Sequence, residues 1–139
     1  ISSYGCVFTG IGVTPTTNQI VLCYPKELKV YNHDYDDTNL VSLTKQFEPN
    51  IKFENLVDCC VANDNLFVVL DSTLCKVGVF NFKDNKLSLV VTWGKFGSKE
   101  NAYGFNKPSS CHIDSKQNLY IADTGNACVK IYTYLAATS

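Results

Sequence analysis

Short apolar runs alternate with clusters of turn-forming residues along most of this chain. The clearest example is near the C-terminal end, where residues 111–113, 119–121 and 129–132 are apolar. The two runs between them, 114–118 and 123–126, are rich in Asp, Asn and Gly. Asp accepts hydrogen bonds from backbone N–H groups of its own turn, and Gly supplies the positive φ that a tight reversal needs. The pattern therefore predicts three short antiparallel strands joined by tight turns.

The same pattern recurs along the sequence. Residues 118–120 match residues 65–67, fifty-three residues earlier, and the tetrapeptide 129–132 matches those at 77–80 and 28–31. These matches divide the chain into three units of roughly 45–50 residues, a period typical of β-propeller blades. No window shows a 3.6-residue apolar stripe, and Gly, Asn and Pro interrupt every candidate helix. The sequence therefore predicts an all-β protein.

Each unit is predicted to be one propeller blade. The first spans residues 10–53, the second 54–105 and the third, which is incomplete, 106–139, while residues 1–9 form a closing strand. The strands expected in the first two units are 11–13, 19–23, 28–32, 40–45, 56–61, 66–70, 76–82 and 87–93.

Spaced glycines, a Phe-x-x-Pro sequence and an Asp-x-Gly-Asn turn occur together in the third unit. This combination resembles the NHL repeat, the blade of one class of β-propeller. The resemblance covers residues 93–132 and departs from the family at its signature tripeptide, where Asn126-Ala127-Cys128 replaces Asn-His-Leu. The matching residues are Gly94, Gly97, Phe105, Pro108, Asp114, Leu119, Tyr120, Ile121, Asp123, Gly125 and Asn126.

Three blades are too few to close a ring, because propellers typically contain about four to eight. An open arc leaves apolar sheet faces in water, which favours association. We therefore expect either the remainder of a longer propeller or a homodimer with six blades, the commonest number that the NHL resemblance implies. In the dimer, residues 2–9 of each chain pair with residues 129–134 of the partner chain.

Charge narrows the range of partners. The formal net charge is −1, and all twelve basic residues are Lys. Arg is the usual residue for bidentate contacts to phosphate or guanine, so nucleic-acid binding is disfavoured. No run approaches the roughly 18 apolar residues of a membrane span, so we expect no membrane interaction.

Seven cysteines, an odd number, occur without a Cys-x-x-Cys pair, and most lie among strand-forming apolar residues. Disulfide frameworks usually have even counts and loop-borne cysteines, so the distribution predicts buried free thiols. Such thiols are typical of the cytoplasm or another reducing compartment. The adjacent Cys59 and Cys60 should point to opposite faces of a strand, which favours packing over redox chemistry.

Candidate metal ligands are few, because the chain has only two histidines, His33 and His112. Strand alternation places His112 and Asp114 on the same face of their strand. His112 is then either a metal ligand or base in the propeller channel, or a histidine hydrogen-bonded to a neighbouring blade. The acidic run 34–37 lacks the ligand spacing and Gly of a calcium loop, so we expect it to be solvated.

The resemblance also bears on catalysis. Some NHL-like enzymes, the peptidylglycine amidating lyases, bind zinc through a histidine directly after the blade-opening proline. In this chain Ser109 follows Pro108, which argues against the zinc lyase mechanism.

The sequence shows no nucleophile–base pair and no set of metal ligands, so no catalytic residue or cofactor is assigned. It predicts a non-catalytic scaffold or binding module that presents loops to a protein, peptide or other ligand. The alternative is a metal-dependent hydrolase or lyase with Ca²⁺ or Zn²⁺ in the central channel, and the third is RNA binding through a Lys-bearing face. Asp123 and Asn126 are also explained as turn residues. The candidate ligand-binding residues are Lys107, Ser109, His112, Asp123 and Asn126.

Overall fold

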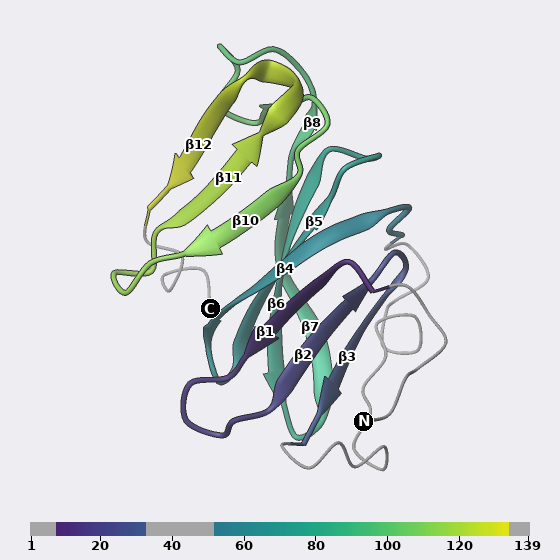
Figure 1. The fold of residues 1–139 in the computed structure, drawn as a ribbon, viewed down its shortest axis with the longest axis vertical. Coiled ribbons are helices and arrows are strands. Elements are labelled where there is room, and N and C mark those ends of the chain that lie inside the picture. Colours follow the sequence, from purple (N-terminus) through teal and green to yellow (C-terminus); the bar gives the residue numbers. More distant parts are fainter. Residues whose placement is uncertain (1–7, 33–51, 134–139) are drawn as a thin grey trace.

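The structure is a computed structural model, and it describes residues 8–32 and 52–133 (Figure 1). Several expectations fall outside these residues. They are most of the closing strand at 1–9, the strand at 40–45, the acidic run with His33, and the tail after residue 133.

The described chain is all-β, as predicted, and contains three antiparallel sheets and one short parallel pair of strands. Every strand predicted in the described residues is present, with ends within two residues of the expected ones. No helix long and apolar enough to cross a membrane occurs among these residues. The antiparallel strands are β1 (Gly10–Val13), β2 (Ile20–Tyr24), β3 (Glu27–Tyr31), β4 (Leu56–Asn63), β5 (Leu66–Asp71), β6 (Lys76–Lys83), β7 (Lys86–Trp93), β10 (Ser110–Ile113), β11 (Leu119–Asp123) and β12 (Cys128–Tyr132).

The three antiparallel sheets are arranged as consecutive propeller blades. Blade 1 is β1–β3, blade 2 is β4–β7 and blade 3 is β10–β12, and within each blade every strand pairs with the next along the chain. The first strand of blade 2, β4, packs against the first strands of both other blades, β1 and β10. Figure 1 shows the sheets fanning out from these three strands. The first strand of each blade is therefore the innermost one.

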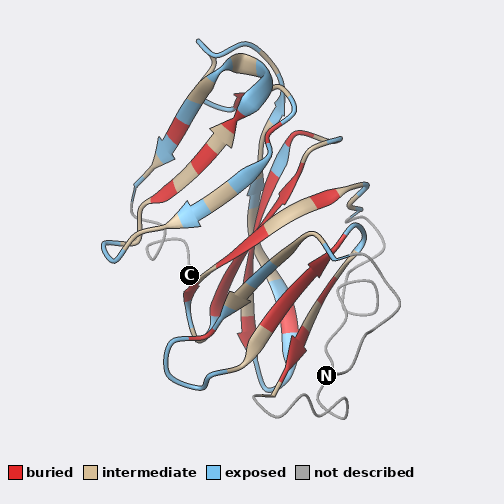
Figure 2. Ribbon diagram, in the orientation of Figure 1, coloured by how far each residue is buried: buried red, intermediate tan, exposed pale blue. Residues whose placement is uncertain are grey.

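Apolar side chains fill the spaces on both sides of blade 2, and all six residues of β5 are buried (Figure 2). Successive side chains of a strand point to opposite faces. As a result, Phe67 and Val69 join the core between blades 1 and 2, whereas Val68 and Leu70 join the core between blades 2 and 3. Blade 2 is thus packed like an interior layer of a propeller.

Blade 1 approaches blade 2 closely because β1 carries two glycines on the facing side. A Cβ atom on Gly12 would lie 2.8 Å from a methyl carbon of Val61, and one on Gly10 would lie 2.7 Å from Asp58 Oδ1. Distances this short are repulsive, so only glycine permits the observed spacing. The side chains of Ile11 and Val13 point away from blade 2 and are exposed.

The connection between blades 2 and 3, residues 94–105, is more ordered than the sequence predicted. Strands β8 (Lys95–Phe96) and β9 (Gly104–Phe105) pair in parallel within it. The N–H groups of Lys95 and Gly97 donate to the carbonyls of Tyr103 and Phe105 at 3.1 and 3.0 Å. Two-residue strands have no detectable periodicity, which explains why the pattern indicated only a polar connection. We call residues 94–105 the connection.

Blades 2 and 3 repeat each other at a constant offset of 52 residues. Cys59 pairs with Val69 in blade 2, and Cys111 pairs with Ile121 in blade 3. The sequence match suggested an offset of 53 residues, because it aligned Leu66 with Leu119, the first residues of β5 and β11. In the strand pairing Leu66 corresponds to residue 118, so β5 begins one residue earlier than β11. The corresponding positions are Phe53 and Phe105, Asp71 and Asp123, Gly78 and Lys130, and Phe80 and Tyr132.

Candidate functional site

Asp123, a predicted ligand-binding residue, ends β11 and is fully buried. Its Oδ1 accepts the backbone N–H of Asn106 at 2.8 Å, and its Oδ2 accepts the side-chain amide of Asn126 at 2.8 Å. Both oxygens are therefore engaged in holding the turn after β11 against the entry to blade 3. The corresponding Asp71 accepts four backbone N–H groups in the same way.

The remaining predicted residues at this end of blade 3 lie around a 3-10 helix, Thr124–Asn126. The hydroxyls of Ser109 and Thr124 share a hydrogen bond of 2.5 Å, and Asn126 donates to the Gly97 carbonyl at 2.9 Å. Lys107 is exposed and has a φ of +50°. The turn thus brings together Ser109, Asp123 and Asn126, with Lys107 two residues before Ser109.

His112 lies apart from this turn, in the middle of β10. It is exposed and stands opposite Tyr120 in the strand register. Cys111 and Ile113 on either side of it pack into the core between blades 2 and 3, so the predicted alternation of this strand is confirmed. Cys60, which corresponds to His112 in blade 2, faces blade 3. By the same geometry, His112 lies on the face of blade 3 that points away from blade 2.

Asp114, the acidic neighbour predicted to share a face with His112, is engaged in its own turn. Its carboxylate accepts the backbone N–H groups of Asn118 and Lys116, each at 2.9 Å, and the Tyr120 hydroxyl at 2.8 Å. These hydrogen bonds, first of all that from Asn118, lower the pKa of Asp114 to about 2. Among the described residues, no group of three or more His, Cys, Asp or Glu side chains is arranged to hold a metal ion.

Asp58 is a candidate that sequence reasoning missed. It lies in β4, the innermost strand of blade 2, and its Oδ2 accepts the backbone N–H of Cys111 in blade 3 at 2.9 Å. Its Oδ1 accepts the N–H of Cys59 at 2.9 Å. Burial raises the pKa of Asp58 in spite of these hydrogen bonds. A lone carboxylate within the apolar run 56–61 was the available signal.

Lys130 is the second residue that the sequence did not single out. Its side chain is 8% exposed, and Nζ lies 3.5 Å from Asp123 Oδ2. The ammonium group also donates to the carbonyls of Ser98 at 3.4 Å, Asn101 at 2.6 Å and Gly104. A buried cation is stabilised only when such partners compensate its lost hydration. Lys130 therefore binds the backbone of the connection to blade 3.

The connection holds aromatic side chains in solvent while its backbone is anchored. Phe96 is 73% exposed and Tyr103 is 57% exposed. Lys130 and Asn126 bind carbonyls on the same segment. The connection therefore combines an anchored backbone with two exposed aromatic rings.

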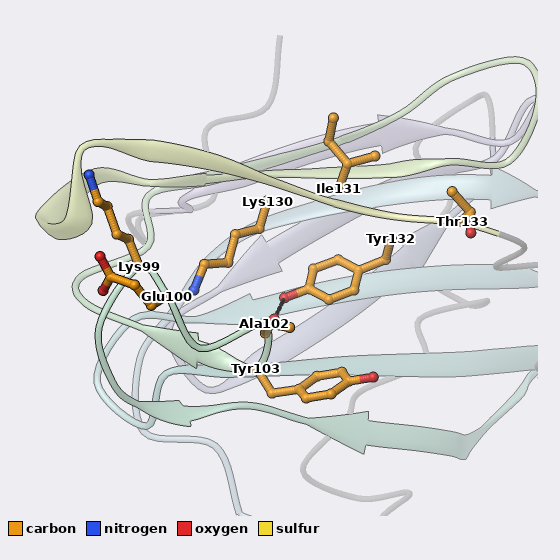
Figure 3. A pocket seen from close by; sticks show the side chains of 8 residues that line it. All are labelled: Lys99, Glu100, Ala102, Tyr103, Lys130, Ile131, Tyr132 and Thr133. Atoms are coloured by element: carbon orange, nitrogen blue, oxygen red, sulfur yellow. Dashed lines mark hydrogen bonds between the residues drawn. The ribbon is translucent and has the colours of Figure 1, made fainter.

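A cavity of about 590 Å³ lies between the connection and β12 (Figure 3). The Tyr132 hydroxyl donates to the Ala102 carbonyl at 2.5 Å, and the Tyr103 ring stacks on the Tyr132 ring with a centroid separation of 6.2 Å. Burial raises the pKa of Tyr132 to about 12. The cavity wall is therefore fixed, with Tyr103 at its exposed rim. The lining residues are Lys99, Glu100, Ala102, Tyr103, Lys130, Ile131, Tyr132 and Thr133.

Comparison with known proteins supports the propeller architecture. No protein-family model matches the chain, and no curated protein matches it. Solved structures do match. They include a selenomethionine-substituted virginiamycin B lyase from Staphylococcus aureus (12% identity, TM-score 0.55) and a streptogramin B lyase (9% identity, TM-score 0.57). A catalytically inactive virginiamycin B lyase from Staphylococcus aureus with quinupristin also matches (12% identity, TM-score 0.57).

These matches cover 97%, 97% and 100% of this chain but only 44%, 43% and 45% of the respective lyase chains. The chain thus spans less than half the length of these propellers. At such low identity the similarity defines the fold alone: the chain has the architecture of part of a β-propeller.

Proposed function

We propose that this chain is the blade-bearing part of an NHL-like propeller that acts as a non-catalytic binding module. The connection presents Phe96 and Tyr103 to a protein or peptide partner. The free thiols of the described cysteines support a reducing compartment such as the cytoplasm for this module.

The observation that carries this proposal is the contrast between the anchored backbone of the connection and its exposed rings. Phe96 and Tyr103 are 73% and 57% exposed, whereas the carbonyl of Asn101, between them in the chain, accepts Lys130 Nζ at 2.6 Å. A loop already held in one conformation loses little conformational entropy when a partner binds. Aromatic side chains are also the residues that most often dominate binding energy at protein interfaces.

The experiment is selection of peptides from a random library on the immobilised chain, followed by measurement of their affinity. The double variant Phe96→Ser/Tyr103→Ser should weaken binding at least about thirtyfold, since a hot spot contributes about 2 kcal/mol or more. Ile11→Ser is the matched control, because Ile11 is equally exposed, at 61%, but lies on blade 1. Equal affinity for the double variant and the control would refute the proposal.

A metal-dependent hydrolase or lyase is the second candidate, and the structural similarity to streptogramin and virginiamycin B lyases favours it. Asp58 in the innermost strand of blade 2, with its raised pKa, and the exposed His112 are the side chains to test. Stoichiometric Ca²⁺ or Zn²⁺ in the purified protein, lost in Asp58→Asn or His112→Ala, would favour this candidate. Peptide binding that survives both substitutions would favour the binding module.

We further propose that blade 3 packs against another blade, supplied by a second copy or by the remainder of a longer propeller. Val129 and Ile131 are 62% and 56% exposed and lie on the face away from blade 2. On blade 1, the face that points away from blade 2 is exposed at Ile11 and Val13 of β1 but buried at Leu22 and Tyr31. Light scattering that gives twice the 15.4 kDa chain mass would support the homodimer, and a stable monomer would exclude it.

A further inference from the structure

Blade 3 has an open strand edge on its outer side (Figure 1). In the described residues its sheet has three strands and ends at β12, whereas the sheet of blade 2 has a fourth strand, β7, that pairs antiparallel with β6. The offset of 52 residues superimposes β12 on β6. The outer edge of β12 is therefore the place that β7 occupies in blade 2. A strand edge of this kind presents unpaired N–H and C=O groups to a possible partner strand.

The cavity beside the connection follows this edge. Four consecutive residues, 130–133, form one wall, and the other wall comes from the connection between Lys99 and Tyr103. Figure 3 shows Ile131 and Tyr132 on opposite sides of β12, so the strand turns its edge, and not one of its faces, toward the cavity. The volume of about 590 Å³ lies within the range of sites that hold ligands, about 300–1,000 Å³.

The hydrogen-bond pattern of blade 3 shows which backbone groups face the open edge. The Asp114 N–H donates to the Asn118 carbonyl at 3.0 Å, so Asn118 bonds toward β10 and the next residue, Leu119, bonds toward β12. Leu119 pairs with Tyr132. Tyr132 therefore bonds toward β11, and the N–H and C=O groups of its neighbour Ile131 point to the open edge.

Apolar side chains accompany these outward backbone groups. Val129, two residues before Ile131, has the same orientation, and the two side chains are 62% and 56% exposed. In blade 2 the equivalent residues, Val77 and Val79, are fully buried, and each pairs with an apolar residue of β7. The fourth strand of blade 2 thus supplies apolar side chains at every second position, opposite the same two places in the repeat.

We propose that the open edge of β12 binds an extended peptide, which pairs antiparallel with β12 as β7 pairs with β6 and adds a fourth strand to blade 3. The inference rests on the proposed peptide binding by the connection, because Tyr103 lines the same cavity. The occupant is a segment of a partner protein with β-branched or aromatic residues opposite Val129 and Ile131. Apolar pairs across neighbouring strands stabilise such an arrangement.

Two kinds of contact hold the peptide. The outward N–H and C=O groups of Val129 and Ile131 bond its main chain, which gives affinity that depends little on sequence. Peptide side chains opposite Lys130 and Tyr132 point to the other face, toward the connection and Tyr103. Selected peptides should therefore show apolar residues at every second position.

The first test is an N-methyl scan of a peptide selected on the immobilised chain. Each N-methyl group removes one backbone donor of the peptide without changing the protein. We expect affinity to fall by at least about threefold at every second residue and to change little at the residues between them, because only alternate N–H groups face β12. A uniform loss, or no loss at any position, would contradict strand pairing.

A protein variant tests the same edge. Ile131→Lys places a charge beside the bound strand, a substitution that natural edge strands use against pairing, and should weaken binding by at least about threefold. Val13→Lys is the matched control, because Val13 is also a β-branched strand residue, 54% exposed, but lies on blade 1. Equal affinities of the two variants, each with the urea midpoint of the wild type, would overturn the inference.

Hydrogen exchange separates this inference from the proposed function. The peptide should slow exchange at the amides of Val129 and Ile131 and leave that of Lys130, which bonds toward β11, unchanged. If these amides do not respond although Phe96→Ser/Tyr103→Ser abolishes binding, the inference is wrong and the proposed function stands. If the double variant binds normally, or no peptide can be selected, both fail. Slow exchange at Ile131 before peptide is added would mean that the protein itself fills the edge, for example through residues 2–9 of a second copy, and would also overturn the inference.

Discussion

Replacement of Lys130 by Met tests whether one buried ammonium group anchors the connection. Met retains much of the volume of the Lys side chain and removes its charge and donors. Lys29 provides a matched control, because it is the middle residue of β3 as Lys130 is of β12. Each ammonium also lies over an aromatic ring, at 5.1 Å from the Tyr24 centroid for Lys29 and 5.3 Å from the Phe105 centroid for Lys130.

The two substitutions differ in the partners that lose a hydrogen bond or a counter-ion. Without Lys130, the buried Asp123 carboxylate loses its counter-ion, and the carbonyls of Asn101 and Gly104 lose a donor. Removal of one partner from a buried ion pair typically destabilises a protein by about 3–5 kcal/mol. Lys29 pairs with Glu27 at 3.6 Å near the surface, with side chains 27% and 35% exposed. Such pairs contribute about 0–1 kcal/mol.

Urea unfolding followed by fluorescence of the single tryptophan, Trp93, measures the difference. With a urea dependence of about 1–3 kcal/mol/M, Lys130→Met should lower the midpoint by about 1–5 M, and Lys29→Met by about 1 M at most. Hydrogen exchange should also accelerate at amides 95–104 in Lys130→Met alone. Equal midpoints for the two variants would refute the anchoring role of Lys130.

Three further predictions concern other parts of the fold. Asp71→Asn leaves two of four backbone N–H groups without an acceptor and should lower the free energy of unfolding in urea by about 2–5 kcal/mol. Asp84→Asn, in the β6–β7 turn, should leave this free energy unchanged, and equal values for the two variants would contradict the role of Asp71. Since the pKa of Asp114 is lowered to about 2, its carboxylate stabilises the fold above about pH 4, and this contribution is lost as the pH falls towards 2. Asp114→Asn should therefore flatten the unfolding midpoint across that acid range, and an unchanged profile would count against it. Gly12→Ala places a Cβ 2.8 Å from a Val61 methyl carbon and should lower the free energy of unfolding by about 1–3 kcal/mol. A urea midpoint equal to that of the wild type would show that blades 1 and 2 do not approach as closely as described.

Strand positions were readable from the sequence because apolar alternation and turn residues are local signals. A period of two predicted that Cys111 and Ile113 share the face of β10 opposite to His112, and the Asp-x-Gly-Asn sequence predicted the turn at Asp123. Both features depend only on neighbouring residues.

Lys130 shows what a local pattern leaves out. Alternation along residues 129–132 does not tell which of the two faces is buried. In the structure Val129 and Ile131 are exposed and Lys130 is buried. Its burial depends on carbonyls of the connection, about thirty residues away in the chain, and no local pattern encodes that contact.

Asp58 was missed for a related reason. Its role comes from the Cys111 N–H, supplied by a different blade, and from the space that Gly10 leaves beside it. A polar residue within an apolar strand is a detectable anomaly, but its partner appears only when the blades are packed together.

The most direct test of the proposed binding role is an NMR titration of the ¹⁵N-labelled chain with a peptide selected on it. If the connection is the recognition surface, the largest chemical-shift changes will fall at residues 95–104 and at the neighbouring cavity residues 131–133. Changes concentrated instead at residues 107–112 and 123–126 would place binding at the end of blade 3 that holds Lys107, Ser109 and Asn126, and would contradict the proposal.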